Sequence, residues 1–270
     1  MSLDLPDGAQ SPVVRHALAD GILTVTLDDT ETRNAIGPDV NPAIAALMRR
    51  AAHEAAVRAV VITGANGYFS SGGNVAALER TLAMSEAERS EVTGRLGAMI
   101  ESVRGAPKPV IAAVEGGAAG IGFSLVLAAD IVVAARDARF AAAQVRLGLT
   151  PDGGISRFLA EAMPHQLAAE ILLRGRPVSA TRLNEFGLVN ELTEPGEALA
   201  GARAIATSLA EGPVRAMARI KHLLAEARTG SLAHTLAREG ATINAARSDP
   251  EAAEGIAAFR EKRPPRFARS

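Results

Sequence analysis

The strongest constraint on the fold is a set of short apolar runs that alternate with helical patterns. Ala59–Thr63 and Pro109–Val114 are apolar runs of strand length, and Ile131–Ala134 is a third. Such runs are typical of strands that are covered on both faces, because neither face needs polar side chains. A helical pattern from about residue 86 to 103 lies between the first two runs. Strands joined by helices in this order predict parallel crossovers and an α/β fold.

Further elements extend this core. Val13–Leu18 and Ile22–Leu27 are β-prone runs on either side of an Asp-Gly pair, which predicts a β-hairpin. Residues 38–56 have apolar positions at helical spacing, which predicts a helix. Leu188–Leu192 is expected to be the last strand.

From Gly196 onward the spacing is helical only. The sequence therefore predicts an α/β core over residues 1–195 and a helical segment, used in oligomerisation, over residues 196–270. Ser248-Asp249-Pro250-Glu251 has the pattern of a capped helix start. The expected helices are residues 199–210, 213–227, 231–246 and 250–262.

The composition excludes several classes of function. A net charge of -1, with Lys and Arg spread along the chain, gives no field that attracts nucleic acid or an anionic membrane. Aromatic residues make up only 3%, which disfavours stacking on single-stranded bases. The chain has no Cys, so disulfides, thiolate metal sites and cysteine nucleophiles are excluded, and its five His residues share no metal-ligand spacing.

Membrane insertion is not expected either. The longest apolar run, Ile121–Ala135, is interrupted by Asp130 and is too short to span a bilayer. The first ten residues lack the basic and apolar regions of a secretory signal. We therefore expect a cytoplasmic protein with no metal and with neither nucleic acid nor a membrane as its partner.

Two glycine-rich stretches follow predicted strands. Gly67–Asn74 comes after the strand at Ile62, and Gly116–Ser124 comes after the strand at Val114. Glycine lets main-chain N–H groups approach a ligand closely, and a helix N-terminus adds a favourable dipole. Two such junctions side by side in one sheet can direct two amides at one oxygen, as in an oxyanion hole.

Other interpretations of these stretches were weighed. Each stretch by itself is also explained by a tight turn that only Gly fits. A dinucleotide-binding loop requires a third glycine at position 125, which is Leu125, and no Gly-Lys-Ser/Thr loop occurs. No Gly-x-Ser-x-Gly motif surrounds a serine, which argues against a serine hydrolase.

Several short motifs follow one another along nearly the whole chain. They are Ile62-Thr63-Gly64, Phe69–Asn74, Lys108–Gly116, Ala119–Gly122, Ala129-Asp130-Ile131, Ala138-Arg139-Phe140, Leu147–Gly154, Ala180–Val189, Glu254–Phe259 and Lys262-Arg263. In order and spacing, this set resembles the crotonase (enoyl-CoA hydratase/isomerase) superfamily from about residue 13 to 267. The resemblance implies a ClpP-like spiral of ββα units with a C-terminal helical segment, assembled as a homotrimer or a dimer of trimers.

The resemblance also implies a set of catalytic positions. The oxyanion hole falls on the main-chain N–H groups of Gly73 and Ile121. Family hydratases use two glutamates, and those positions are Ser124 and Gln144 here, neither of which ionises as a carboxylate does. One acid remains on the appropriate loop, Asp152, where family isomerases place a catalytic Asp.

Asp152 has a second explanation, because Asp before a helix is often only an N-cap. The segment Leu149–Gly154 looks most like the epoxyphenylacetyl-CoA isomerase and oxepin-CoA hydrolase-like branch, in which one Asp serves without the glutamate pair. On that resemblance we expect a catalytic Asp152 in an apolar acyl pocket.

Coenzyme A is expected as part of the substrate, with no separate cofactor. By resemblance, Arg33, Asn34, Ala35 and Ser71 lie near its adenine and pantetheine. Phe259, Lys262 and Arg263 are expected to meet the CoA from a neighbouring subunit. Solvated surface charge is the alternative explanation for Arg33, Lys262 and Arg263.

The sequence therefore predicts an acyl-CoA enzyme of isomerase type, in which Asp152 moves a proton while two amides hold a thioester enolate. Two alternatives stay open. One is an enoyl-CoA hydratase that holds water with Ser124 and Asp152. The other is a catalytically weak acyl-CoA-binding paralogue, since fold by itself does not establish function.

Overall fold

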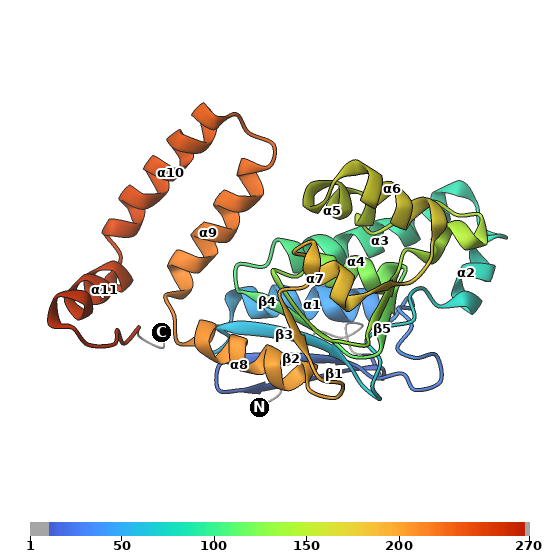
Figure 1. Cartoon of the computed structure of the whole chain (residues 1–270), viewed down its shortest axis with the longest axis horizontal. Coiled ribbons are helices and arrows are strands. Elements are labelled where there is room, and N and C mark those ends of the chain that lie inside the picture. Colours follow the sequence, from blue (N-terminus) through green and yellow to red (C-terminus); the bar gives the residue numbers. More distant parts are fainter. Residues whose placement is uncertain (1–10, 268–270) are drawn as a thin grey trace.

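The structure, a computed structural model, describes residues 11–267 and has the α/β architecture that the sequence predicts (Figure 1). A six-stranded sheet has the order β1-β2-β3-β4-β6-β9, and a three-stranded sheet has the order β5-β7-β8. The strands are β1 (Val14–Ala19), β2 (Ile22–Leu27), β3 (Ala59–Gly64), β4 (Val110–Val114), β5 (Gly117–Ala119), β6 (Ile131–Ala135), β7 (Arg139–Ala141), β8 (Val178–Ser179) and β9 (Glu191–Thr193). The α-helices are α1 (Val40–His53), α2 (Val75–Thr81), α3 (Glu86–Arg104), α4 (Ile121–Ala128), α5 (Ile155–Ala162), α6 (His165–Arg174), α7 (Ala180–Glu185), α8 (Ala198–Ala210), α9 (Val214–Ala227), α10 (Leu232–Arg247) and α11 (Pro250–Glu261).

The larger sheet begins with the predicted hairpin. β1 and β2 pair antiparallel through a turn in which Asp20 and Gly21 both have positive φ, 54° and 79°. This is the backbone conformation that an Asp-Gly pair favours in a two-residue hairpin. Every later neighbour in this sheet, from β2 to β9, pairs parallel, as the predicted crossovers require.

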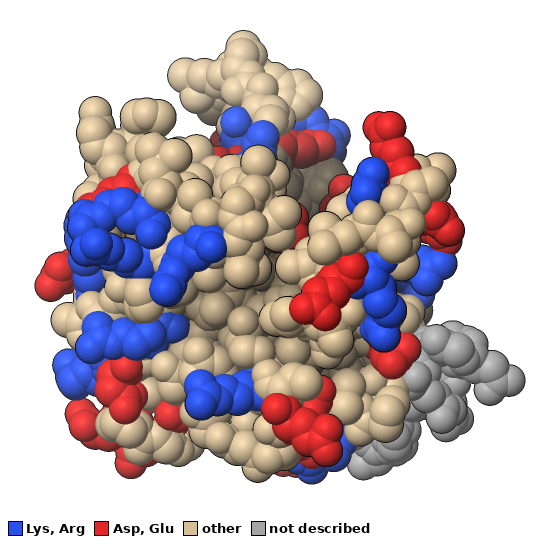
Figure 2. All heavy atoms as spheres, turned by 90° about the vertical axis from the view of Figure 1, so that its right-hand side faces the viewer, with Lys and Arg blue, Asp and Glu red and all other residues tan. Residues whose placement is uncertain are grey.

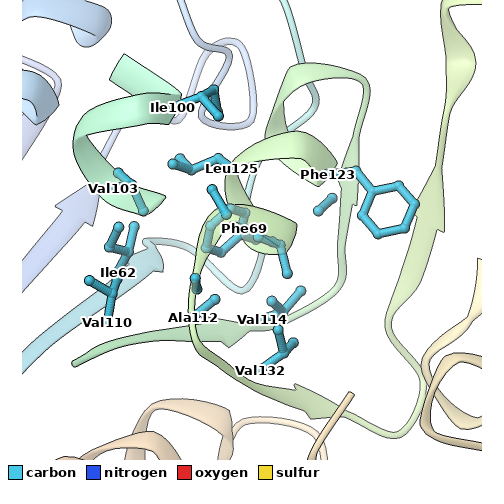
Figure 3. Packing of buried hydrophobic residues seen from close by; sticks show 14 of the residues in the cluster. Ile62, Phe69, Ile100, Val103, Val110, Ala112, Val114, Phe123, Leu125 and Val132 are labelled. Carbon is cyan, nitrogen blue, oxygen red and sulfur yellow. The ribbon is translucent and has the colours of Figure 1, made fainter. Parts of the chain in front are cut away.

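The parallel strands are buried on both faces, which explains their unbroken apolar sequences. Val60 and Ile62 belong to the larger core cluster, whereas Ala59 and Val61 belong to the cluster on the opposite face. This alternation is the two-residue period of a strand. Figure 3 shows side chains of the larger cluster around Phe69, below the helices that cover this face.

The opposite face is covered by α8. Its Ala202, Ala206 and Ala210 pack against β-strand residues of the smaller cluster, so the segment after residue 195 begins by completing the core. The buried guanidinium of Arg58 donates to the carbonyl oxygens of Ala210 and Gly212, which anchors the end of this helix. Beyond it, α9, α10 and α11 extend away from the sheet (Figure 1).

Two local predictions need correction. The strand expected at Leu188–Leu192 is shorter and later, because Leu188 and Val189 are turn residues whose amides bond to the carbonyl oxygen of Leu183. The Ser248 hydroxyl does not cap α11, whose N-cap is Asp249, without a side-chain capping bond. The carboxylate of Glu251 instead accepts from the amides of Arg215 and Ala216, in the first turn of α9.

The predictions also missed the small sheet of β5, β7 and β8. Each of these strands has only two or three residues, too few for a two-residue period to be recognised. β5 lies inside the second glycine-rich stretch, so the chain forms a short strand between β4 and α4. Among residues 11–267, every helix is too short or too polar to cross a bilayer.

A tight contact joins α4 to the loop that precedes α5. Gly153 and Gly154 both have left-handed backbones, with φ of 59° and 77°. A Cβ atom added at Gly153 would lie 2.2 Å from Cδ1 of Ile121 and 3.0 Å from Cβ of Ser124. Gly148 also has a left-handed backbone, with φ of 71°, but no atom lies within 4 Å of the Cβ position there.

Substituting these glycines separates backbone strain from crowding. A left-handed alanine costs about 1–2 kcal/mol, and both Gly153→Ala and Gly148→Ala incur that cost. Gly153→Ala adds overpacking of about 1–3 kcal/mol, because Ile121 and Ser124 must move. Urea denaturation should therefore give a larger loss of unfolding free energy for Gly153→Ala. Equal losses in the two variants would contradict the close contact.

The chain after α11 folds back onto that helix through Glu254. Arg263 donates to both carboxylate oxygens of Glu254, at 2.7 and 3.0 Å, and the Arg266 amide donates at 2.6 Å. The Arg263 bonds, followed by the Arg266 bond, lower the pKa of the Glu254 carboxyl from 4.5 to about 2. The ionised carboxylate therefore orders residues 263–266 beside α11.

This pair predicts a local acid response. Because the pKa of Glu254 is lowered in the folded protein, the contact is fully present above pH 4.5 and is lost as the pH falls toward 2. Hydrogen exchange should show a protected Arg266 amide in the wild type and in Glu239→Gln, an exposed control on α10, at pH values above this window. Glu254→Gln should lose that protection at the same pH. Unchanged protection in Glu254→Gln would refute the assignment.

Candidate active site

The two glycine-rich stretches meet at one cavity of about 200 Å³. It brings together five residues that the sequence singled out, Ser71, Gly73, Ile121, Gln144 and Asp152. Its other lining residues are Gly72, Val75, Leu78, Leu96, Gly120, Ala143, Leu147 and Leu149.

The two stretches are held together by main-chain hydrogen bonds and by glycine. The Ser70 amide donates to the Gly117 carbonyl oxygen at 3.2 Å, and the Ala119 amide donates to the Ser70 carbonyl oxygen at 3.0 Å. A Cβ atom at Gly72, which has φ of 104°, would lie 2.8 Å from the Ala119 carbonyl oxygen. Only glycine fits this approach, so the bland explanation of a tight packing position and the functional one both apply here.

The main-chain amides of Gly73 and Ile121 donate to no protein atom within residues 11–267. Ile36 bonds to the Gly72 carbonyl oxygen and to the Asn74 amide, so the Gly73 amide between them points away from that pairing. Ile121 is the first residue of α4, where an amide has no acceptor within the helix. The Ile121 side chain is buried and packs toward Gly153. Two donors on the cavity wall are therefore available to a ligand.

Asp152 lies on the cavity wall opposite in sequence to both glycine stretches. Its side chain is exposed, so the expectation of a carboxylate enclosed in an apolar pocket is wrong, and Asp152 lies at the mouth. The Gln144 side-chain amide donates to Oδ1 of Asp152 at 2.9 Å. The alternative role as an N-cap is also wrong, since Gly154 is the N-cap of α5.

Ser124 is close to Asp152 but does not line the cavity. It is fully buried on α4, and its hydroxyl donates to the main-chain carbonyl oxygen of Asp152 at 3.1 Å. This geometry places the Ser124 hydroxyl behind the cavity wall, where it supports the loop that carries Asp152.

Apolar residues around the mouth were only partly anticipated. Val75 and Leu78 lie in the segment 75–95 that the sequence associates with substrate choice, whereas Leu147 and Leu149 were not predicted to line the site. Val75 and Leu147 are unusually exposed for apolar residues, 63% and 64%. Exposure cannot be read from a sequence, so only the Leu-Gly-Leu spacing could have drawn attention to them. On the face that carries α2, Figure 2 shows uncharged residues around a hollow, with Lys and Arg gathered to one side.

The residues predicted to bind CoA near the N-terminus lie beside the first glycine stretch. The Ser71 amide donates to the Arg33 carbonyl oxygen at 2.9 Å, and the Ala35 amide donates to the Thr32 hydroxyl at 3.0 Å. The Ser71 hydroxyl donates to the Thr32 carbonyl oxygen at 2.6 Å. These residues form one continuous edge next to the cavity, and the Arg33 side chain lies exposed over the Tyr68 ring.

Asn34 has a structural task of its own. It is 2% exposed, its Nδ2 donates to the carbonyl oxygens of Ala65 and Tyr68, and its Oδ1 accepts from the Asp29 amide. All of these bonds are to the main chain. Asn34 therefore supports the loop before the first glycine stretch and leaves its polar atoms little capacity for a ligand.

Phe259 and Lys262 are not brought to this cavity within the chain. Phe259 on α11 is 87% exposed, and Lys262 ends that helix with a left-handed backbone. Figure 1 shows α11 at the opposite end of the molecule from α2. If these residues act on CoA, they act in another copy of the chain.

Two other features compete less well as a site. A larger cavity of about 400 Å³ lies between α9 and the sheet edge, but it contains none of the unpaired glycine-junction amides. Among the described residues, no three His, Asp or Glu side chains gather closely enough to hold a metal ion. The cavity at the glycine junctions is therefore the candidate active site.

Comparison with known proteins places this geometry in a family. Residues 18–270 match the sequence model of enoyl-CoA hydratase/isomerase. The crystal structure of an enoyl-CoA hydratase from Polaromonas sp. JS666 superposes with a TM-score of 0.92 at 40% identity, covering 94% of this chain and 99% of that one.

Two curated relatives cover similar shares. Enoyl-CoA hydratase EchA19 of Mycobacterium tuberculosis is 32% identical over 250 residues, 91% of this chain and 92% of the relative. The 1,2-epoxyphenylacetyl-CoA isomerase of Escherichia coli K12 is 30% identical over 249 residues, 92% of this chain and 95% of the relative. The chain therefore belongs to the enoyl-CoA hydratase/isomerase family of the crotonase superfamily.

Proposed function

We propose that the chain is an acyl-CoA isomerase in which Gly73 and Ile121 stabilise a thioester enolate and Asp152 moves a proton. The observation that carries the proposal is the cavity itself. Two main-chain amides with no protein acceptor and one carboxylate line the same 200 Å³ space, and no second carboxylate lines it.

The chemistry follows from these groups. The thioester carbonyl oxygen accepts from both amides, which stabilises the negative charge that develops when the α- or γ-carbon loses a proton. Removing one such donor costs about 3 kcal/mol of transition-state stabilisation. Asp152 takes the proton from one carbon and returns it to the other, so the double bond moves and nothing is added or lost.

The mouth of the cavity suits an acyl chain. Val75, Leu78, Leu147 and Leu149 offer apolar surface beside the amides, and the exposed apolar area there would be covered when a substrate binds. A CoA moiety would extend along the edge formed by Arg33 and Ser71. We further propose that Phe259 and Lys262 reach this edge from a neighbouring copy in a trimer, because both lie far from it in their own chain.

Hydration is the second candidate, favoured by the names of the Polaromonas and Mycobacterium relatives. It requires a group that activates water. Ser124 is poorly placed for that role, because its hydroxyl is buried and donates to the carbonyl oxygen of Asp152. A hydratase reaction would therefore rest on Asp152 without a second acid, whereas isomerisation needs only one carboxylate. The weak-paralogue alternative predicts binding without conversion.

Asp152→Asn tests the proton carrier. The amide cannot accept the proton, so kcat should fall by about 10²- to 10⁴-fold while the affinity for the CoA ester stays close to that of the wild type. Turnover assays and calorimetric titration measure the two effects. Asp137→Asn, at an exposed position away from the cavity, is the matched control and should behave like the wild type. Full activity of Asp152→Asn would remove Asp152 from the mechanism.

A panel of acyl-CoA esters separates the three functions. Enoyl-, dienoyl- and 1,2-epoxyphenylacetyl-CoA are incubated with the wild type, and products are analysed by chromatography and mass spectrometry. Isomerisation gives a new compound of unchanged mass, and hydration adds the mass of one water. We expect an isomer. A dominant hydrated product would support the hydratase, and binding of every ester without conversion would support the paralogue.

A further inference from the structure

Both residues at the family's glutamate positions form hydrogen bonds to Asp152. Ser124 donates to its main-chain carbonyl oxygen at 3.1 Å, and Gln144 donates to its carboxylate Oδ1 at 2.9 Å. The two donors come from different elements, α4 and the 3₁₀ helix at Ala143–Leu147. They therefore fix Asp152 at two points, one on its main chain and one on its side chain.

The loop around Asp152 needs such support. It has two consecutive left-handed glycines, Gly153 and Gly154, and therefore has more backbone freedom than any neighbouring segment. Besides Ser124, the carbonyl oxygen of Asp152 accepts only a long bond from the Ile155 amide, at 3.4 Å. Because Ser124 is fully buried and rigidly held on α4, its hydroxyl connects this loop to the core.

The orientation of the Gln144 side chain is set by Asp152. A carboxylate only accepts hydrogen bonds, so the NH₂ group of Gln144 must face it. As a consequence, Oε1 of Gln144 is buried and has no hydrogen-bond partner within the described part of the chain. A buried acceptor left without a partner is unfavourable, so the bond to Asp152 is made at the expense of the other end of the amide.

The bond leaves the two carboxylate oxygens of Asp152 in different states. Oδ1 is held by Gln144, whereas Oδ2 has no protein partner among residues 11–267. We propose that Gln144 and Ser124 are positioning residues, which hold Asp152 so that Oδ2 is presented to the substrate carbon as the proton carrier. This inference rests on the proposed proton-transfer role of Asp152. It assigns the two replaced glutamate positions a shared structural purpose in place of acid–base chemistry.

Gln144→Met tests the side-chain contact. Methionine is close to glutamine in length but cannot donate, so the carboxylate is no longer held in one orientation. We expect kcat to fall by about 10- to 100-fold with KM changed by less than about 3-fold, because misplacement of a catalytic group affects the reaction step more than binding. Gln166→Met, at an exposed position on α6, is the matched control and should leave both constants unchanged. Wild-type kcat in Gln144→Met would overturn the proposal.

A double-mutant cycle shows whether Gln144 acts through Asp152. In the Asp152→Asn background no proton carrier remains, so Gln144→Met should cause no further loss of kcat. An additional loss of the same size in that background would show that Gln144 acts independently and would refute the positioning role. Ser124→Ala should reduce kcat less than Gln144→Met, with the thermal unfolding midpoint reporting any general destabilisation.

A structural measurement separates this inference from the proposed function. Crystal structures of the wild type and of Gln144→Met should show one Asp152 side-chain orientation in the former and a changed or dispersed one in the latter. An identical Asp152 orientation in both would refute the positioning role even if Asp152→Asn is inactive. If Asp152→Asn is fully active, the proposed function fails, and the crystal structures still decide whether Gln144 fixes the carboxylate.

Discussion

The candidate site depends on the close approach of two main-chain segments, residues 70–73 and 117–122. Parallel neighbours β3 and β4 bring them to one edge of the sheet, and hydrogen bonds between Ser70 and the second segment fix their register. The approach is possible because Gly72 and Gly122 have no side chains. A Cβ atom at Gly122 would lie 2.7 Å from Cβ of Ser70. The unpaired amides of Gly73 and Ile121 follow from this packing, since each lies one residue beyond or before a glycine contact.

Much of the core could be predicted because its pattern has a simple physical cause. The strands around Val61 and Ile111 are buried on both faces, so their sequences are apolar throughout, and the Asp-Gly turn requires a backbone that few other pairs adopt. Capping at the start of α11 was predicted wrongly for a related reason. Glu251 has the spacing of a local cap, but a long-range partner, the N-terminus of α9, takes its carboxylate. Local spacing cannot reveal such a partner.

The site was predictable to a different degree at each position. Gly73 and Ile121 act through the main chain, so the glycine pattern and the resemblance together were sufficient to place them on one cavity. The exposure of Asp152 and the apolar rim at Leu147 depend on how the loop before α5 folds, which involves two left-handed glycines. The bonds from Ser124 and Gln144 to Asp152 span 28 and 8 residues along the chain, and no periodic pattern encodes them.

These contacts suggest why a single carboxylate can serve at this cavity. With two glutamates, each would be an ionisable group that needs its own support, and their charges would oppose each other at short range. Here the buried position carries a neutral hydroxyl and the half-buried position a neutral amide, so neither competes with Asp152 for the negative charge. Both instead supply donors, and a donor directed at a carboxylate stabilises its charged form. The replacement of acids by neutral donors thus concentrates the negative charge of the site on one residue at the mouth, beside the amides that would stabilise an enolate.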